Sequence, residues 1–183
     1  PQHVIEMGGV VSNKLQTLTS SDSAGAISNR QRQATAVLKD LDRWIQAQVQ
    51  TVPAGQRVLV TSHRSFAPMA RRYGIKELPL LDKYATGGTL RPSSLSKISA
   101  AIKASGTKAI FADNLPPTKT MRRISRSSGV PIAPQPLYSE GTAPGRSLVQ
   151  TATDNVCNFV NAQGGTCNEQ QAEKLEARWA AIT

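Results

Sequence analysis

Two histidines and one acidic residue occupy positions from which side chains could bind a metal ion. His63 follows Val58-Leu59-Val60, an apolar run with turn residues beside it, which predicts a buried strand of a parallel sheet. Glu140 follows a later run of this kind, and His3 lies near the start of the sequence. Ligand sites gather past the carboxyl ends of parallel strands. Two imidazoles and one carboxylate are donors that suit Zn(II) and also accept Mn(II) or iron.

The residues alone leave other interpretations open. A lone histidine after a strand is about as often a loop or capping residue without a ligand. Two histidines and twelve acidic residues also offer many such triples by chance. The sequence holds neither a Gly-x-Ser-x-Gly turn nor a phosphate-binding loop. The remaining enzymatic alternative is a zinc hydrolase with an open water position and Asp113 as its base, but we expect no enzyme.

The order of apolar runs and helical patterns predicts the fold class. Strands that alternate with helices give a parallel sheet covered by helices. We therefore expect an α/β fold in which a parallel four-stranded sheet has helices on both faces and a long helix precedes it. The polar stretch 85–89 is expected to be a loop. The predicted strands are 58–60, 75–81, 108–112 and 130–133, and the predicted helices are 66–73, 92–105, 116–128, 148–160 and 172–182.

The clearest helical pattern covers residues 26–49, and Pro53 and Gly55 end the helix. Some 24 residues at 1.5 Å per residue give a length of about 36 Å. Before it, residues 10–18 have a weak helical pattern and residues 19–25 resemble a polar loop. The sequence thus divides into residues 1–25, the long helix 26–52 and an α/β lobe 53–183. The apolar positions of the long helix are Ile27, Ala34, Leu38, Leu41, Ile45 and Val49.

The chain has 22 Lys and Arg residues against 12 acidic residues, a formal net charge of +10. The basic residues occur singly or in pairs, which is more typical of a solvated surface than of a nucleic-acid footprint. Aromatic residues are scarce, which argues against a base-stacking surface. A basic nucleic-acid-binding module is the alternative from another functional class, and salt-dependent DNA retention would favour it. The apolar runs are too short to span a bilayer, so we expect no transmembrane segment.

The two cysteines, Cys157 and Cys167, lie on either side of Gly164-Gly165, where the chain could turn back. In an oxidising compartment they could close a small loop with a disulfide worth about 3 kcal/mol. Two free thiols are the alternative. Their spacing is not that of a CxxC pair, which argues against a structural zinc or redox site.

Several segments resemble the periplasmic zinc- and manganese-binding proteins of ABC importers. Residues 60–75 (Val-Thr-Ser-His-Arg-Ser-Phe through Tyr-Gly-Ile) resemble the family's segment around a metal-binding histidine. Leu137-Tyr138-Ser139-Glu140 resembles the Leu-Tyr-Thr-Asp segment with the last metal carboxylate, and His3-Val4 resembles the Asp-Pro-His-Val-Trp segment with an earlier ligand. The resemblance covers most of the chain and is specific from 57 to about 165. Further likeness lies in 108–114, 121–125, 129–132 and 154–156.

This resemblance implies that His3, His63 and Glu140 are the metal ligands. It implies Zn(II) as the transported ligand, with Mn(II) as the alternative, and no organic cofactor. The implied partner is the ABC permease of a metal importer, with no nucleic acid. The implied location is periplasmic or extracellular, with membrane anchoring through a missing N-terminus as a further option.

Departures from the family pattern also carry expectations. Glu140 stands where aspartate is usual, Gln2 separates Pro1 from His3, and Ile5 replaces the tryptophan. The first lobe of the family is largely absent, so residues 1–25 are expected to be its remnant, and one ligand histidine has no candidate. We expect a three-ligand site completed by water and an exposed apolar face near Ile5 and Met7. A lobe that has lost metal binding is the third interpretation.

Overall fold

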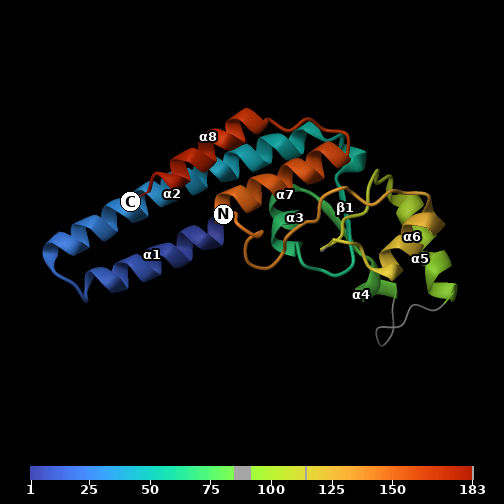
Figure 1. The fold of residues 1–183 in the computed structure, drawn as a ribbon, viewed down its shortest axis with the longest axis horizontal. Coiled ribbons are helices and arrows are strands. Elements are labelled where there is room, and N and C mark those ends of the chain that lie inside the picture. Colours follow the sequence, from blue (N-terminus) through green and yellow to red (C-terminus); the bar gives the residue numbers. More distant parts are fainter. Residues whose placement is uncertain (85–91, 114, 183) are drawn as a thin grey trace. The chain divides into compact units, whose positions relative to one another are not determined.

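A computed structural model describes residues 1–84, 92–113 and 115–182 (Figure 1). They form two compact units, one of residues 48–167 and one of residues 1–47 with 168–183. The stretch 85–89, predicted as a loop, lies outside the described residues. Among the described helices, none combines the length and the apolar character that a membrane span requires. The elements are α1 (Gln2–Gln16), α2 (Ser21–Thr51), η1 (Ala54–Gln56), β1 (Val58–Thr61), α3 (Ala67–Tyr73), β2 (Lys76–Pro79), α4 (Leu80–Tyr84), α5 (Pro92–Ser105), α6 (Lys119–Ser128), α7 (Leu148–Ala162) and α8 (Glu169–Ala180).

The unit of residues 48–167 is built on a parallel sheet, as the alternation of strands and helices predicted. β1 pairs with β2 in parallel, with Val58 opposite Lys76 and Thr61 opposite Pro79. The predicted third strand lies beside β1, because the Phe111 N–H donates to the Val60 carbonyl at 2.8 Å. The α/β fold class with a parallel sheet is therefore confirmed.

The prediction of four full strands is not confirmed in the described residues. In the part of the chain that the structure describes, the third and fourth segments meet in a single parallel bridge between Ile110 and Ile132, and only β1 and β2 form a regular ladder. Pro131 has no N–H to donate to a ladder. The Ala112 carbonyl accepts instead from the Leu137 N–H at 2.9 Å. The second predicted strand is also shorter than 75–81, because the chain turns into α4 after Pro79.

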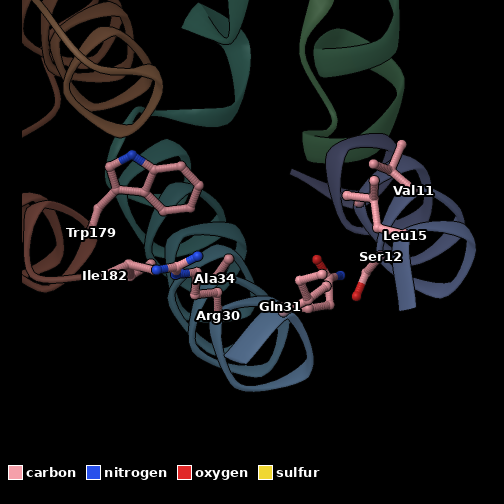
Figure 2. Close-up of a pocket in the computed structure, with 10 residues that line it drawn as sticks. Val11, Ser12, Leu15, Arg30, Gln31, Ala34, Trp179 and Ile182 are labelled. Atoms are coloured by element: carbon pink, nitrogen blue, oxygen red, sulfur yellow. The ribbon is translucent and has the colours of Figure 1, made fainter. Parts of the chain in front are cut away.

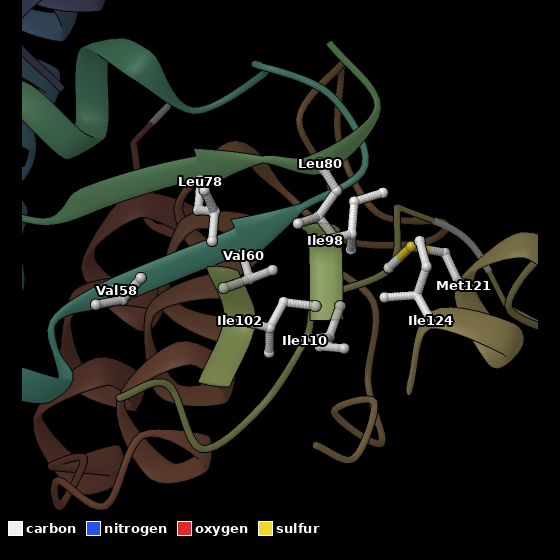
Figure 3. Packing of buried hydrophobic residues seen from close by; sticks show 9 residues of the cluster. All are labelled: Val58, Val60, Leu78, Leu80, Ile98, Ile102, Ile110, Met121 and Ile124. Atoms are coloured by element: carbon white, nitrogen blue, oxygen red, sulfur yellow. The ribbon is translucent and has the colours of Figure 1, made fainter. Parts of the chain in front are cut away.

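One face of the sheet carries a core of nine buried aliphatic side chains from the strand segments and from α4, α5 and α6 (Figure 3). Alternate strand residues point to the same face, so Val58 and Val60 both enter this core. Burying one side chain of this size contributes roughly 1.5–3 kcal/mol. The nine residues are Val58, Val60, Leu78, Leu80, Ile98, Ile102, Ile110, Met121 and Ile124.

Helix α7 covers residues of the opposite face. The Phe111 ring lies 5.7 Å from the ring of Phe159, measured between centroids. At the end of α7, the fully buried side chain of Gln163 donates to the Val58 carbonyl at 2.7 Å and accepts from the Lys108 N–H at 2.9 Å. It also donates to the Thr107 hydroxyl at 2.7 Å. One amide side chain therefore joins α7 to β1 and to the third strand segment.

The other unit corrects the expectations for residues 1–25. The weak helical pattern of residues 10–18 belongs to a longer helix, since α1 spans Gln2–Gln16, and residues 19–25 are not a loop throughout, since α2 begins at Ser21 rather than at residue 26. The polar residues predicted as a loop start the helix, since the Ala24 N–H donates to the Ser20 carbonyl and Asp22 lies in the first turn. Of the two residues near which apolar exposure was expected, Met7 is 60% exposed, whereas Ile5 is only partly exposed.

Helix α8 belongs with α1 and the first part of α2, although the sequence grouped it with the α/β lobe. Arg178 pairs with Asp40 at 2.7 Å, and the Trp44 indole donates to the Asn168 carbonyl at 3.3 Å. Asn168 caps α8 by accepting from the Gln171 N–H. These contacts explain why α8 starts at Glu169, earlier than predicted.

A groove of about 480 Å³ lies between α1, α2 and the C-terminal residues of this unit. Figure 2 shows Trp179 and Ile182 on one side of α2 and Val11 and Leu15 of α1 on the other. The residues that line the groove include no histidine, cysteine or acid, so its chemistry is not that of a metal site.

The predicted disulfide is confirmed. Cys157 on α7 is bonded to Cys167, ten residues further on, with the two Cα atoms 5.2 Å apart. Gly165 lies inside the closed loop where a Cβ atom would come within 2.6 Å of the Thr51 hydroxyl. The loop is thus closed covalently and packed tightly against the end of α2.

We expect the double substitution Cys157→Ser and Cys167→Ser to lower the free energy of unfolding by about 3 kcal/mol, because the unfolded chain regains the entropy of a short loop. Urea unfolding of oxidised protein, reduced protein and the double variant measures this. The reduced wild type should match the variant. Equal midpoints for oxidised and reduced wild type would contradict the prediction.

We expect Gln163→Leu to lower the free energy of unfolding by at least about 2 kcal/mol, because a leucine leaves the buried Val58 carbonyl and the Lys108 N–H without these partners. The matched control is Gln171→Leu on the exposed surface of α8, which should change stability little. Thermal unfolding of both variants provides the comparison. A Gln163→Leu variant as stable as the control would show that these bonds contribute nothing net.

Candidate functional site

His63 lies in the turn that leaves the carboxyl end of β1. Its carbonyl accepts hydrogen bonds from the Thr61 hydroxyl at 2.7 Å and from the Ser65 N–H at 3.0 Å. The turn is joined to α4, since the Leu81 N–H donates to the Ser62 carbonyl at 2.9 Å. The backbone is therefore fixed while 60% of the imidazole side chain stays exposed to incoming ligands.

Asp82 of α4 contacts this histidine directly. Its Oδ1 lies 2.8 Å from His63 Nδ1, and its Oδ2 accepts from the Arg64 N–H at 2.6 Å. The hydrogen bond with His63, followed by that from Arg64, holds the pKa of Asp82 below its ordinary value. Asp82 is therefore an ionised hydrogen-bond acceptor at neutral pH.

Asp113 follows the third strand segment and is half-buried. Its Oδ1 is buried and has no hydrogen-bond partner among the described residues. Burial raises the pKa of Asp113, the charge of His63 lowers it, and the charge of Glu140 raises it. The Asp113 carboxyl thus lies within electrostatic range of His63 and Glu140, two of the three residues that the sequence predicted as ligands.

Glu140 lies in an exposed loop after the fourth strand segment. The start of this loop is held by the Leu137 N–H on the Ala112 carbonyl. Asn155 of α7 then pairs with both backbone groups of Tyr138, accepting from its N–H at 2.9 Å and donating to its carbonyl at 2.8 Å. Contacts to its backbone position the loop, and the side chain of Glu140 is exposed to solvent.

His3 lies on α1, in the other compact unit. Its side chain is 78% exposed, and its Nδ1 is 3.5 Å from Glu6 Oε2. Its role as a ligand stays a prediction, as do those of His63 and Glu140. Within the described residues, no three His, Cys, Asp or Glu side chains already converge closely enough to hold an ion.

The structure draws attention to two acidic residues, Asp82 and Asp113, that the sequence analysis did not propose as metal ligands. Asp82 was not singled out from the sequence, and Asp113 was considered only as the base of a hydrolase. Parallel register could have indicated Asp82: Thr61 is opposite Pro79, so residues two or three positions further on meet at one edge. This required knowing which strands are neighbours, which the sequence pattern did not settle.

We expect Asp113→Asn to raise the melting temperature at pH 7, because it removes a carboxylate whose charged form is disfavoured by burial. A raised pKa in the folded state means that the ionised group destabilises the fold above that pKa. The gain should be below about 1 kcal/mol, because the group is only half-buried, and should vanish as pH falls below the ordinary carboxyl value.

Melting curves from pH 7 down to about pH 3 measure this difference. Glu173→Gln, an exposed site on α8, is the control for loss of one negative charge. If the difference in melting temperature between wild type and Asp113→Asn grew larger toward low pH, the predicted sign of the effect would be wrong.

Residues 1–162 match the family described as "Zinc-uptake complex component A periplasmic". The zinc-binding protein TroA of Treponema pallidum is 30% identical over 135 residues, which cover 68% of this chain and 43% of that protein. The manganese-binding lipoprotein MntA of Halalkalibacterium halodurans is 28% identical over 130 residues, covering 68% of this chain and 42% of that protein. The chain thus spans less than half the length of these curated relatives.

Solved structures agree on the fold. Periplasmic zinc-binding protein TroA from Treponema pallidum matches with a TM-score of 0.70 at 22% identity, covering 85% of this chain and 58% of that one. Fe(III)-bound YtgA from Chlamydia trachomatis matches with a TM-score of 0.70 at 20% identity, covering 88% and 59%. Since the family match extends over most of the sequence, the chain belongs to the family of periplasmic metal-binding proteins of ABC importers that is described as zinc-uptake complex component A.

Proposed function

We propose that this chain captures a divalent transition metal ion outside the cytoplasm and delivers it to an ABC permease. Zn(II) is the metal that we propose. His63 and Glu140 bind the ion from the carboxyl edge of the sheet, and His3 is the third protein ligand. Water completes the coordination. The role is coordination and release of the ion, not catalysis.

The observation that carries this proposal is the unsatisfied oxygen of Asp113. A buried carboxylate oxygen without a partner is costly. Here it lies within electrostatic range of an imidazole and a second carboxylate. A cation held near these groups would offset that cost, whereas a purely structural cluster would be expected to pair its own carboxylate.

The choice of metal follows from the donors. Two imidazoles with one carboxylate fit Zn(II), whose common ligands are His nitrogen and carboxylate oxygen. Mn(II) favours a larger share of oxygen donors and is the alternative. The relatives support this range, since they are named as zinc-binding, manganese-binding and, for YfeA of Yersinia pestis, iron-binding proteins.

Two observations support the proposed compartment and partner. The Cys157–Cys167 disulfide is typical of proteins in an oxidising compartment. The family is described as periplasmic, and one relative is described as a lipoprotein. Both support a periplasmic or extracellular location, and the permease of a metal importer is the partner that we propose.

We expect His63→Ala to weaken zinc binding at least tenfold, because it removes a nitrogen donor from a site with few protein ligands. Calorimetric titration of wild type and variant at pH 7.5 measures the dissociation constants. Binding by the wild type should also weaken toward pH 5, where protons compete for the imidazoles.

The control is Lys103→Ala on the exposed surface of α5, which should leave the zinc affinity unchanged. Equal affinities for His63→Ala and Lys103→Ala would rule out His63 as a ligand. Retention of DNA that is lost with salt, in a chain without metal affinity, would favour the basic binding module instead.

A further inference from the structure

The contact between His63 and Asp82 holds the imidazole ring in one orientation, unlike a surface ion pair that forms and breaks. Asp82 uses both carboxylate oxygens, one on His63 Nδ1 at 2.8 Å and one on the Arg64 N–H at 2.6 Å. A carboxylate held at both oxygens cannot rotate freely about its last bond. The direction in which it accepts from the imidazole is therefore set by the backbone of the same turn.

The backbone on both sides of this contact is fixed as well. The Leu81 N–H donates to the Ser62 carbonyl at 2.9 Å, which places the start of α4 beside the turn after β1. On the far side of the turn, the Phe66 N–H donates to the Glu77 carboxylate at 3.2 Å. Side chain and backbone contacts thus join the two segments repeatedly between residues 61 and 82.

The chemistry of the pair determines which ring nitrogen is free. An ionised carboxylate only accepts hydrogen bonds, so the nitrogen that faces it must carry a proton. In a neutral imidazole the other nitrogen then holds a lone pair. Histidines that bind metals commonly donate their second ring N–H to a carboxylate, which fixes the tautomer and the ring orientation.

We propose that Asp82 is a positioning residue that holds His63 in the Nδ1–H tautomer, so that Nε2 is presented as the nitrogen donor to the metal ion. The purpose of this arrangement rests on the proposed function, but the tautomer is a property of the metal-free protein. Asp82 does not itself bind the ion.

Nitrogen NMR tests the tautomer directly. The chain has two histidines, so ¹⁵N-histidine labelling gives two imidazole patterns, and the His3→Gln variant assigns them. At pH 8.5 without metal, wild-type His63 should show a protonated Nδ1 and an unprotonated Nε2. Asp82→Ala should convert this pattern to a mixture of the two tautomers, and Asp82→Asn should do so in part. Wild-type His63 with its proton on Nε2 would overturn the proposal, whatever the metal affinity.

Zinc titration tests the consequence for the site. Asp82→Ala should weaken binding about 10- to 100-fold, the usual effect of removing such a partner. Asp22→Ala, an exposed acid on α2, controls for the loss of one negative charge and should change affinity little. Unchanged affinity in Asp82→Ala, while His63→Ala binds weakly, would overturn the positioning role.

A double-mutant cycle separates positioning from direct coordination. In the His63→Ala background, Asp82→Ala should add almost no further loss, because Asp82 acts through His63. A full additional loss would identify Asp82 as a ligand in its own right and overturn the proposal. If the wild type bound no zinc, manganese or iron, the proposed function would fail and with it the role toward a metal, whereas the NMR pattern would still report the His63–Asp82 bond.

Discussion

The hydrogen bonds of the Gln163 amide connect the elements on which the candidate site depends. The amide donates to the Val58 carbonyl at the start of β1 and accepts from the Lys108 N–H at the start of the third strand segment. β1 leads to His63, and the third segment leads to Asp113. Gln163 itself ends α7, whose Asn155 holds the backbone of Tyr138 before Glu140. A single buried side chain therefore fixes three elements at the edge of the sheet opposite to the site. Buried amides that are fully satisfied in this way specify one arrangement, because every alternative leaves polar groups without partners.

The two aspartates near His63 illustrate how a fold assigns different states to one chemical group. Asp82 accepts two hydrogen bonds and is stabilised as an anion. Asp113 is half-buried, has one oxygen without a partner in the described structure, and has a raised pKa. The first is suited to orient a neighbour, since its bonds are already made. The anion of the second would be stabilised by a nearby positive charge, which is why Asp113 supports the proposal of a cation site.

Local patterns predicted much of the architecture. The apolar run at 58–60 predicted β1, and the periodic apolar positions with Gly106 and Gly129 predicted α5 and α6. The disulfide was also predictable, because Cys157 and Cys167 are near in sequence and a Gly-Gly pair lies between them. These features depend on residues close together along the chain.

What could not be predicted depends on contacts between distant segments. The third and fourth strand segments shrink to a bridge because Leu137 competes for the Ala112 carbonyl. The grouping of α8 with the first part of α2 reflects contacts such as Asp40 with Arg178, which no local pattern reveals. For the site, His63 and Glu140 were proposed from their places after strands and from the family resemblance, and their roles as ligands stay predictions. Asp82 was missed because its significance appears only when α4 is placed beside the turn after β1.

The carboxylates at the sheet edge have an electrostatic consequence in a chain of this charge. The chain carries a formal net charge of +10, whereas Asp82, Asp113 and Glu140 place negative charge near His63. A dication approaching from a distance therefore meets net repulsion, and attraction takes over only close to the edge. At physiological ionic strength, charges separated by more than about 8 Å are largely screened. Added salt weakens the long-range repulsion more than the short-range attraction, so the capture of a cation by this edge should become faster as ionic strength rises, the reverse of a site steered by the charge of the whole molecule.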